Sequence, residues 1–334
     1  RAAGALKGRA RVLDSTPLFD AVATQDTVTQ LRAAIRRLLV VLDQTAPPLA
    51  ARVRARLGRD DEYASAGKPP CDWDDPEARD RLVVDLVGDC LAALAALDGI
   101  ELGGAAAGAV ELVALVAGQD VEVGPDGLFR IARGVARDRQ ISTVDPDARH
   151  GHKTSARSFD GYKGHIALDP DSEIITATAV TAGNAGDAAT APGLLADDPV
   201  EATDVPLAVY ADAAYGSGEL LASLEDAGAT LRIKVQPAAA QGGRSSKDDF
   251  GIDLAAGTVT CPAGRTVPLR PRRRASVAVF GSGCASCPLV ARCTTDRRGR
   301  IVTVSAHEAS LSRARQARRD PEWRDDYRAT RPKV

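Results

Sequence analysis

VPLAVYADAAYGSGE, residues 205–219, is the stretch from which the fold of this chain is best inferred. Its first part is a continuous apolar run of the length of a buried strand, and the run ends at Asp212. Gly216 and Gly218 then predict a turn that opens a helix reaching Ala227. A strand, a turn that carries an acid and a helix are typical of α/β sheets, which place ligands where strands end.

The neighbouring segments extend this pattern. Residues 159–169 and 173–181 are rich in β-forming side chains and flank a Pro-Asp-Ser turn, which predicts a hairpin. Asp187 is expected to cap a helix that runs through Leu195, and residues 229–235 predict another short strand. We therefore expect an α/β fold with a mixed sheet flanked by helices.

The N-terminal third has a different pattern. Residues 10–16 predict a short strand that meets a polar turn at Pro17. The following hundred residues or so are mainly helical by apolar spacing. The predicted helices are residues 27–42, 49–57, 76–97 and 109–118.

The composition of the 334 residues, 44% hydrophobic and 26% charged, excludes membrane and fibrous classes and predicts a soluble protein. The richest apolar stretch, 82–97, is interrupted by two aspartates and a glycine, so no membrane span is expected. The chain has no methionine and no leader, and it stops shortly after Pro332, so we expect a fragment truncated at both ends.

Two aspartates end apolar strands and could carry chemistry. Asp14 and Asp212 each follow an apolar run, so their carboxylates could meet at a shared sheet edge and hold Mg²⁺ or Mn²⁺, which prefer oxygen ligands. The alternative is that each is a cap or turn residue. Asp145 and Asp147 are rivals for the first acid, ranked lower because Pro146 disfavours a central strand.

Asp212–Glu219, together with residues 161–163 and 183–187, resembles the catalytic domain of bacterial insertion-sequence transposases of the DDE type. The resemblance spans most of the chain and implies a ribonuclease-H-like core, with Asp14 as the first metal-binding acid and Asp212 as the second. It also implies metal-dependent cleavage of transposon ends and 3′-hydroxyl strand transfer. The expected partners are transposon and target DNA and a second copy of the chain, in the nucleoid of the cytoplasm.

The third acid of such transposases is a Glu that follows a Tyr and Arg pattern, which Tyr327, Arg328 and Arg331 resemble. We expect this Glu directly after Val334. Glu308 and Glu322 could stand in for it, although acids on an Arg-rich helix are more often ion-pair partners. Two alternative functions therefore stay open: a nuclease of the same fold, and an inactive or domesticated DNA-binding relic.

Four of the six cysteines are grouped in the last quarter of the chain. CASC contributes Cys284 and Cys287, Cys293 follows, and Cys261 lies upstream in CPAG. Four thiolates at this spacing could close a structural Zn²⁺ site, and unliganded thiols are the alternative. The other two, Cys71 and Cys90, are expected to be packing or surface residues.

Basic residues also concentrate in the last quarter, at 265–274 and 292–300, either as a solvated face or as a surface that contacts DNA. The candidate DNA contacts are Lys163, Arg270, Arg272, Arg273, Arg274 and Arg331. The expected organisation is a first catalytic strand at 1–19, a helical insertion at 20–140, the ribonuclease-H-like core at 141–236, a cysteine-bearing, basic β insertion at 237–305 and a truncated helical part of the core at 306–334.

Overall fold

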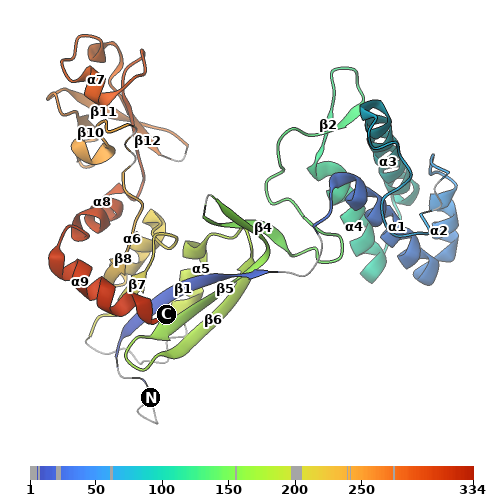
Figure 1. The fold of residues 1–334 in the computed structure, drawn as a ribbon, viewed down its shortest axis with the longest axis horizontal. Coiled ribbons are helices and arrows are strands. Elements are labelled where there is room, and N and C mark those ends of the chain that lie inside the picture. Colours follow the sequence, from blue (N-terminus) through green and yellow to red (C-terminus); the bar gives the residue numbers. More distant parts are fainter. Residues whose placement is uncertain are drawn as a thin grey trace. The chain divides into compact units, whose positions relative to one another are not determined.

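The fold is taken from a computed structural model of the chain. It describes residues 6, 8–19, 24–60, 63–154, 156–196, 205–238, 240, 242–273 and 275–334. The chain divides into two compact units (Figure 1). Unit 1 contains Arg1–Thr16, Gly164–Val180 and Ala185–Val334, and unit 2 contains Pro17–Lys163 and Thr181–Asn184.

Unit 1 is built on a mixed sheet. Its strands are β1 (Ala10–Phe19), β5 (Arg157–Asp169), β6 (Ile174–Ala182), β7 (Ala208–Ala211) and β8 (Thr230–Ile233). The order is β5-β1-β7-β8, with β6 paired to β5. Strands β1, β7 and β8 are parallel neighbours, and β5 and β6 form the predicted hairpin. In Figure 1 the blue β1 lies between the green hairpin and the yellow β7.

Helices complete the core around this sheet. Its main apolar cluster joins Leu13 and Val209 of the strands to Leu194 and Leu221, which lie on α5 and α6. The last α-helix contacts the sheet through two hydrogen bonds. Its Asp326 accepts from Tyr210 of β7, and its Trp323 donates to the carbonyl of Leu231 in β8. The helical elements are α5 (Asp187–Ala196), α6 (Gly218–Asp226), α8 (Glu308–Ala317), α9 (Pro321–Thr330) and the short 3-10 turn η3 (Arg331–Lys333).

A second, smaller sheet belongs to the same unit. It is antiparallel, in the order β13-β12-β11-β10-β9, and Phe250, Val259 and Phe280 contribute to its own apolar core. Its strands are β9 (Gly251–Asp253), β10 (Thr258–Thr260), β11 (Thr266–Pro271), β12 (Ser276–Val279) and β13 (Ile301–Val304). Short helical turns accompany them: η1 (Lys247–Asp249), η2 (Gly281–Cys284) and α7 (Val290–Cys293).

Unit 2 is mainly helical. Asp26 caps the first helix by accepting a hydrogen bond from the Thr29 backbone, and Asp75 caps the third in the same way through Glu77. Apolar side chains of all four helices form one buried cluster. The helices are α1 (Thr27–Thr45), α2 (Pro47–Arg54), α3 (Pro76–Leu97) and α4 (Gly104–Gln119), and the strands are β2 (Val121–Val123), β3 (Phe129–Ile131) and β4 (Arg149–Thr154), the last paired with the start of β5.

Some predicted boundaries were wrong. β1 continues through Pro17, beyond its pairs with β7, the last of which joins Val12 to Tyr210. Asp187 is the first residue of α5 rather than its cap, and it is buried. Before Asp212, β7 is shorter than the apolar run predicts. The Arg-rich tail is two helices, because Asp320 caps a new helix whose first residue is Pro321.

Candidate active site

Asp14 and Asp212 occupy matching positions on neighbouring parallel strands. In the register of β1 and β7, Val12 lies opposite Tyr210. Each aspartate comes two residues after one of these partners. Side chains alternate between the faces of a strand, so both carboxylates project to the face that carries Val12 and Tyr210. Asp14, in the middle of β1, and Asp212, directly after the end of β7, therefore lie on neighbouring strands and on one face of the sheet.

The C-terminal segment lies on that same face. Arg331 donates a hydrogen bond from Nη2 to Oδ1 of Asp14, 2.7 Å away, and its side chain is only 14% exposed. Nε of Arg331 is buried without a hydrogen-bond partner among the described residues. The Tyr327 hydroxyl donates to the carbonyl oxygen of Ala211, the residue before Asp212, over 3.3 Å. Residues from the two ends of the chain thus meet at the end of β7.

The turn after β7 fixes Asp212. Its Oδ1 accepts a hydrogen bond of 2.9 Å from the backbone N–H of Ala214. Gly216 approaches β8 so closely that a Cβ there would lie 2.2 Å from the carbonyl oxygen of Lys234. Ser217 then caps α6 by accepting from the N–H of Leu220. These contacts require the Gly and Ser residues that follow the strand.

Tyr215 is fully buried near Asp14 and Asp212. Its hydroxyl lies 3.3 Å from Nδ1 of the buried His165. Burial raises the pKa of Tyr215, and the negative charges of Asp187, Asp14 and Asp212 raise it further. All three carboxylates are therefore close enough to act on this hydroxyl, which stays neutral at ordinary pH.

Asp187 is a third acid near this edge, to which the sequence assigned only a capping role. It is 6% exposed, and its Oδ2 accepts a hydrogen bond of 2.6 Å from Ser15. Ser15 follows Asp14 and so projects to the opposite face of β1. A buried carboxylate beside β1 leaves no periodic signal in the sequence. Only its position in the Gly-Asn-Ala-Gly-Asp loop could have suggested this role.

The helix α9 is fixed against the sheet by several contacts. The rings of Trp323 and Tyr327 stack with centroids 5.1 Å apart, and Lys234 lies 4.4 Å above the Tyr327 ring. Asp326 accepts hydrogen bonds from Tyr210, over 3.0 Å, and from Arg232, over 2.7 Å. These contacts position Arg331 at the acids.

The rival acids have other partners. Both carboxylate oxygens of Asp145 accept from the Tyr162 hydroxyl at 2.7 Å, within unit 2. Glu308 is buried, and its oxygens lie 2.6 Å from Lys247 and 2.7 Å from Arg315. Burial alone would raise the pKa of Glu308, but its hydrogen bonds with the two cations lower it. Asp147 and Glu322 are exposed at the start of a turn and of α9, respectively.

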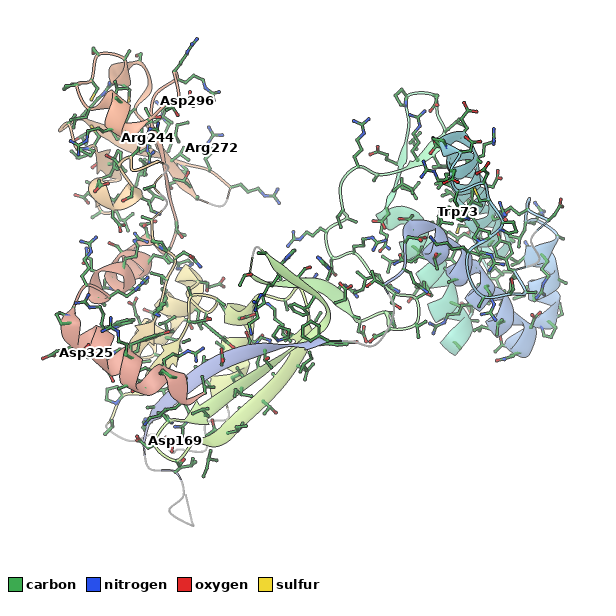
Figure 2. The ribbon with its side chains drawn as sticks, in the orientation of Figure 1. Trp73, Asp169, Arg244, Arg272, Asp296 and Asp325 are labelled. Carbon is green, nitrogen blue, oxygen red and sulfur yellow. The ribbon has the colours of Figure 1, made fainter. Side chains whose placement is uncertain are left out.

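Three of the six candidate DNA contacts lie at the exposed end of the β11–β12 hairpin. Arg270 is in β11, and Arg272 and Arg273 follow it in the turn, where Figure 2 labels Arg272. All three are exposed, and none has an ion-pair partner within the described part of the chain. Arg274 lies outside the described residues. Lys163 is half-buried in β5, in unit 2.

The four C-terminal cysteines line one cavity of about 220 Å³, together with Phe250 and Arg300. All are free thiols and half-buried. Burial raises the pKa of Cys293, and Cys284, Cys261 and Cys287 raise it further, whereas Arg300 opposes them. Cys90 is buried in the helical core, where burial raises its pKa to about 12, and Cys71 packs beside that core.

As the side chains stand, no group of three or more His, Cys, Asp or Glu in the described residues is arranged to hold a metal ion. The site therefore offers two acids on one face rather than a closed set of protein ligands. That number suits Mg²⁺, which is commonly held by one or two carboxylates together with substrate phosphates. In the same described part, no helix has the length and apolar character needed to cross a membrane.

A family model of the transposase DDE domain matches residues 112–305. The match covers more than half of the chain, which therefore belongs to the family of transposase DDE domains. Members act on DNA and in general use divalent metal ions. The matched residues include Asp212 and the four C-terminal cysteines, whereas Asp14 precedes them. No curated protein and no solved structure matches the chain.

Proposed function

We propose that this chain carries the catalytic core of a DNA transposase that cleaves transposon ends and transfers the freed 3′-hydroxyl to target DNA. Asp14 and Asp212 are the proposed metal-binding acids. The observation that supports the proposal is the register of β1 and β7, in which Val12 lies opposite Tyr210, because Asp14 and Asp212 each follow two residues after one of these partners. Acids from distant positions must converge in this way to share divalent ions.

The order of the strands supports a ribonuclease-H-like core. A hairpin follows β1 in the chain, and two further strands then add in parallel on the other side of β1. In the transposases that the sequence resembles, the second acid follows the fourth strand of such a core, and Asp212 follows the fourth of the strands β1, β5, β6, β7 and β8. The helical segment 20–140 and the cysteine-bearing segment 237–305 are then insertions into this core.

Mg²⁺ or Mn²⁺, when bound, would activate an oxygen nucleophile and stabilise the leaving oxygen of the phosphodiester. Asp14 and Asp212 would hold it through their carboxylate oxygens. The hydrogen-bonded turn after β7 keeps Asp212 in a fixed orientation. Tyr215 stays neutral beneath the acids and provides a rigid, buried floor.

Arg331 has two roles in this proposal. Without metal, its guanidinium group compensates the charge of Asp14. With metal and DNA, it is proposed to turn to a phosphate oxygen, because guanidinium groups form strong charge-assisted hydrogen bonds with phosphate. An arginine beside Asp14 favours a negatively charged substrate such as a DNA phosphate, because its positive charge attracts the phosphate towards the two aspartates.

Arg270, Arg272 and Arg273 would bind the DNA backbone, because exposed guanidinium groups that have no acidic partner among the described residues suit phosphate recognition. Lys163 is the proposed contact in the β5–β6 hairpin. Two transposon ends must be brought together, so the working assembly is proposed to be a homodimer at the nucleoid.

The test is a reaction on a labelled plasmid that carries the gene together with the DNA on both sides of it. A transposase yields metal-dependent breaks at two defined ends and then joined products. Cleavage without joining would favour the nuclease, and binding without either reaction would favour the relic. Asp212→Asn removes a proposed metal ligand and should lower the cleavage rate by more than about 100-fold. Losing a residue that only supports a metal ligand already costs up to about 100-fold in activity.

A further inference from the structure

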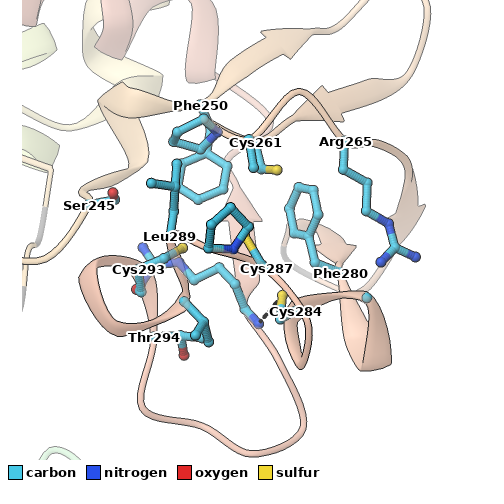
Figure 3. Close-up of a pocket in the computed structure, with 16 residues that line it drawn as sticks. Ser245, Phe250, Cys261, Arg265, Phe280, Cys284, Cys287, Leu289, Cys293 and Thr294 are labelled. Atoms are coloured by element: carbon cyan, nitrogen blue, oxygen red, sulfur yellow. Dashed lines mark hydrogen bonds between the residues drawn. The ribbon is translucent and has the colours of Figure 1, made fainter.

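The cavity of the small sheet is a second place where chemistry-bearing side chains gather, separate from Asp14 and Asp212. Four cysteines from three segments face it: Cys261 after β10, Cys284 and Cys287 around η2, and Cys293 at the end of α7 (Figure 3). Three of them also pack on the apolar core of this sheet. The fold thus brings thiols together from positions up to 32 residues apart in the sequence.

Backbone turns present these cysteines. Cys261 begins a tight turn in which its carbonyl accepts from Gly264 over 2.8 Å, while its own N–H donates to Arg265 over 2.9 Å. Gly264 has φ +79°, a conformation that favours glycine. The N–H of Cys287 donates to the carbonyl of Cys284 over 3.2 Å, which closes the Cys-x-x-Cys turn. These turns lie at the cavity that all four cysteines line.

Arginines and a backbone donor lie beside the sulfurs, and Arg300 acts against the burial that raises the pKa of Cys293. The backbone N–H of Arg300 donates to Sγ of Cys284 at 3.4 Å. The guanidinium group of Arg300 lines the cavity, and its Nε is buried without a partner in the described residues. Arg265 lines the cavity as well. Donors and positive charge beside sulfur offset the excess negative charge that four thiolates would leave on a divalent ion.

We propose that Cys261, Cys284, Cys287 and Cys293 bind one structural Zn²⁺ as a tetrahedral tetrathiolate. Four sulfur ligands leave no open coordination position, so this site takes no part in cleavage. The thiols do not converge as they stand, but a change of rotamer moves each sulfur without moving the backbone. Bound zinc would join the turn of β10–β11 to the loop that follows β12, and so hold the basic hairpin between them.

The test is metal analysis of the chain purified without chelators. We expect one zinc per chain, and loss of that zinc in Cys284→Ser and in Cys261→Ser. Cys71→Ser is the matched control, because Cys71 is a half-buried thiol in the other compact unit, and it should keep the metal. Cobalt should replace the zinc and give the visible absorption of tetrahedral thiolate-bound Co²⁺.

Several results would overturn the zinc site. These are wild-type chain that holds far less than one zinc, Cys284→Ser that holds as much as wild type, and iron with acid-labile sulfide in place of zinc. The zinc content of the wild-type chain tests the site by itself, so the proposal can fail even if a cysteine variant does not fold. Asp212→Asn should keep its zinc, so failure here and failure of the transposase proposal are distinguishable.

Discussion

Arg331 and Asp14, 317 residues apart in sequence, are joined by a hydrogen bond of 2.7 Å from Nη2 to Oδ1. A cation thus already sits where the transposase proposal puts a metal ion. A divalent ion that binds Asp14 must therefore share this carboxylate with Arg331 or displace the arginine from it.

Replacing this arginine should tighten metal binding. Two unit charges about 4 Å apart in water repel by about 1 kcal/mol, so Arg331→Gln should bind Mn²⁺ about five-fold more tightly. Arg328→Gln, on the exposed side of α9, should leave the affinity unchanged. Titration followed by electron paramagnetic resonance measures both. Weaker Mn²⁺ binding by Arg331→Gln would show that Arg331 supports the metal ligands rather than competing with the ion.

Gly216 should tolerate no side chain. A Cβ at this position would lie 2.2 Å from the carbonyl oxygen of Lys234, so Gly216→Ala must shift either the turn or β8. Overpacking of this kind costs about 1–3 kcal/mol of unfolding free energy. Gly186→Ala is the control, because nothing lies within 4 Å of the added carbon. Urea unfolding compares the two, and equal midpoints would contradict the close approach.

Glu308 should make the fold sensitive to acid. Burial raises its pKa, but the hydrogen bonds with Lys247 and Arg315 outweigh burial and lower it. The folded state therefore favours the ionised form, and this stabilisation is present at neutral pH. It is lost as the pH falls below about 4.3, the ordinary pKa of glutamate, towards the lower folded value.

Urea midpoints measured between neutral and acidic pH test this linkage. The wild type should lose stability on acidification more steeply than Glu308→Gln, which cannot ionise at this position. Glu322→Gln, exposed in the first turn of α9, should follow the wild type. Identical pH profiles for wild type and Glu308→Gln would refute the role of the buried ion pairs.

The hairpin arginines should contribute to the salt dependence of DNA binding. Each phosphate contact that is removed reduces the slope of log K against log salt by about 0.9. Arg272→Gln should show this reduction, whereas Arg79→Gln, exposed on α3, should not. Binding isotherms at several salt concentrations provide the slopes. An unchanged slope for Arg272→Gln would remove this hairpin from the DNA surface.

The sequence predicted most elements because their periodic patterns are local. The helices of unit 2, the β5–β6 hairpin and the strand before Asp212 were all expected, and the structure contains them. The family assignment was confirmed as well. That Asp14 and Asp212 lie on neighbouring strands depended mainly on the resemblance, because residues 20–148, which include the four helices of unit 2, separate β1 from the next strand of its sheet.

Features that depend on tertiary contacts could not be read from the pattern. Asp187 looked like a helix cap, yet its buried carboxylate accepts from Ser15 at the far end of the sequence. Glu308 looked like a solvated partner on an Arg-rich helix, yet burial and two cations hold it. Arg331 looked like a DNA contact, and its hydrogen bond with Asp14 became visible only in three dimensions.

The central claim is that Asp14 and Asp212 together hold a divalent metal ion. Mn²⁺ binding to the chain in complex with duplex DNA, followed by electron paramagnetic resonance, tests it most directly. Asp14→Asn and Asp212→Asn should each weaken binding by more than about 10-fold, while Asp98→Asn, an exposed aspartate after α3, should bind as the wild type does. Wild-type Mn²⁺ affinity in both site variants would contradict the claim.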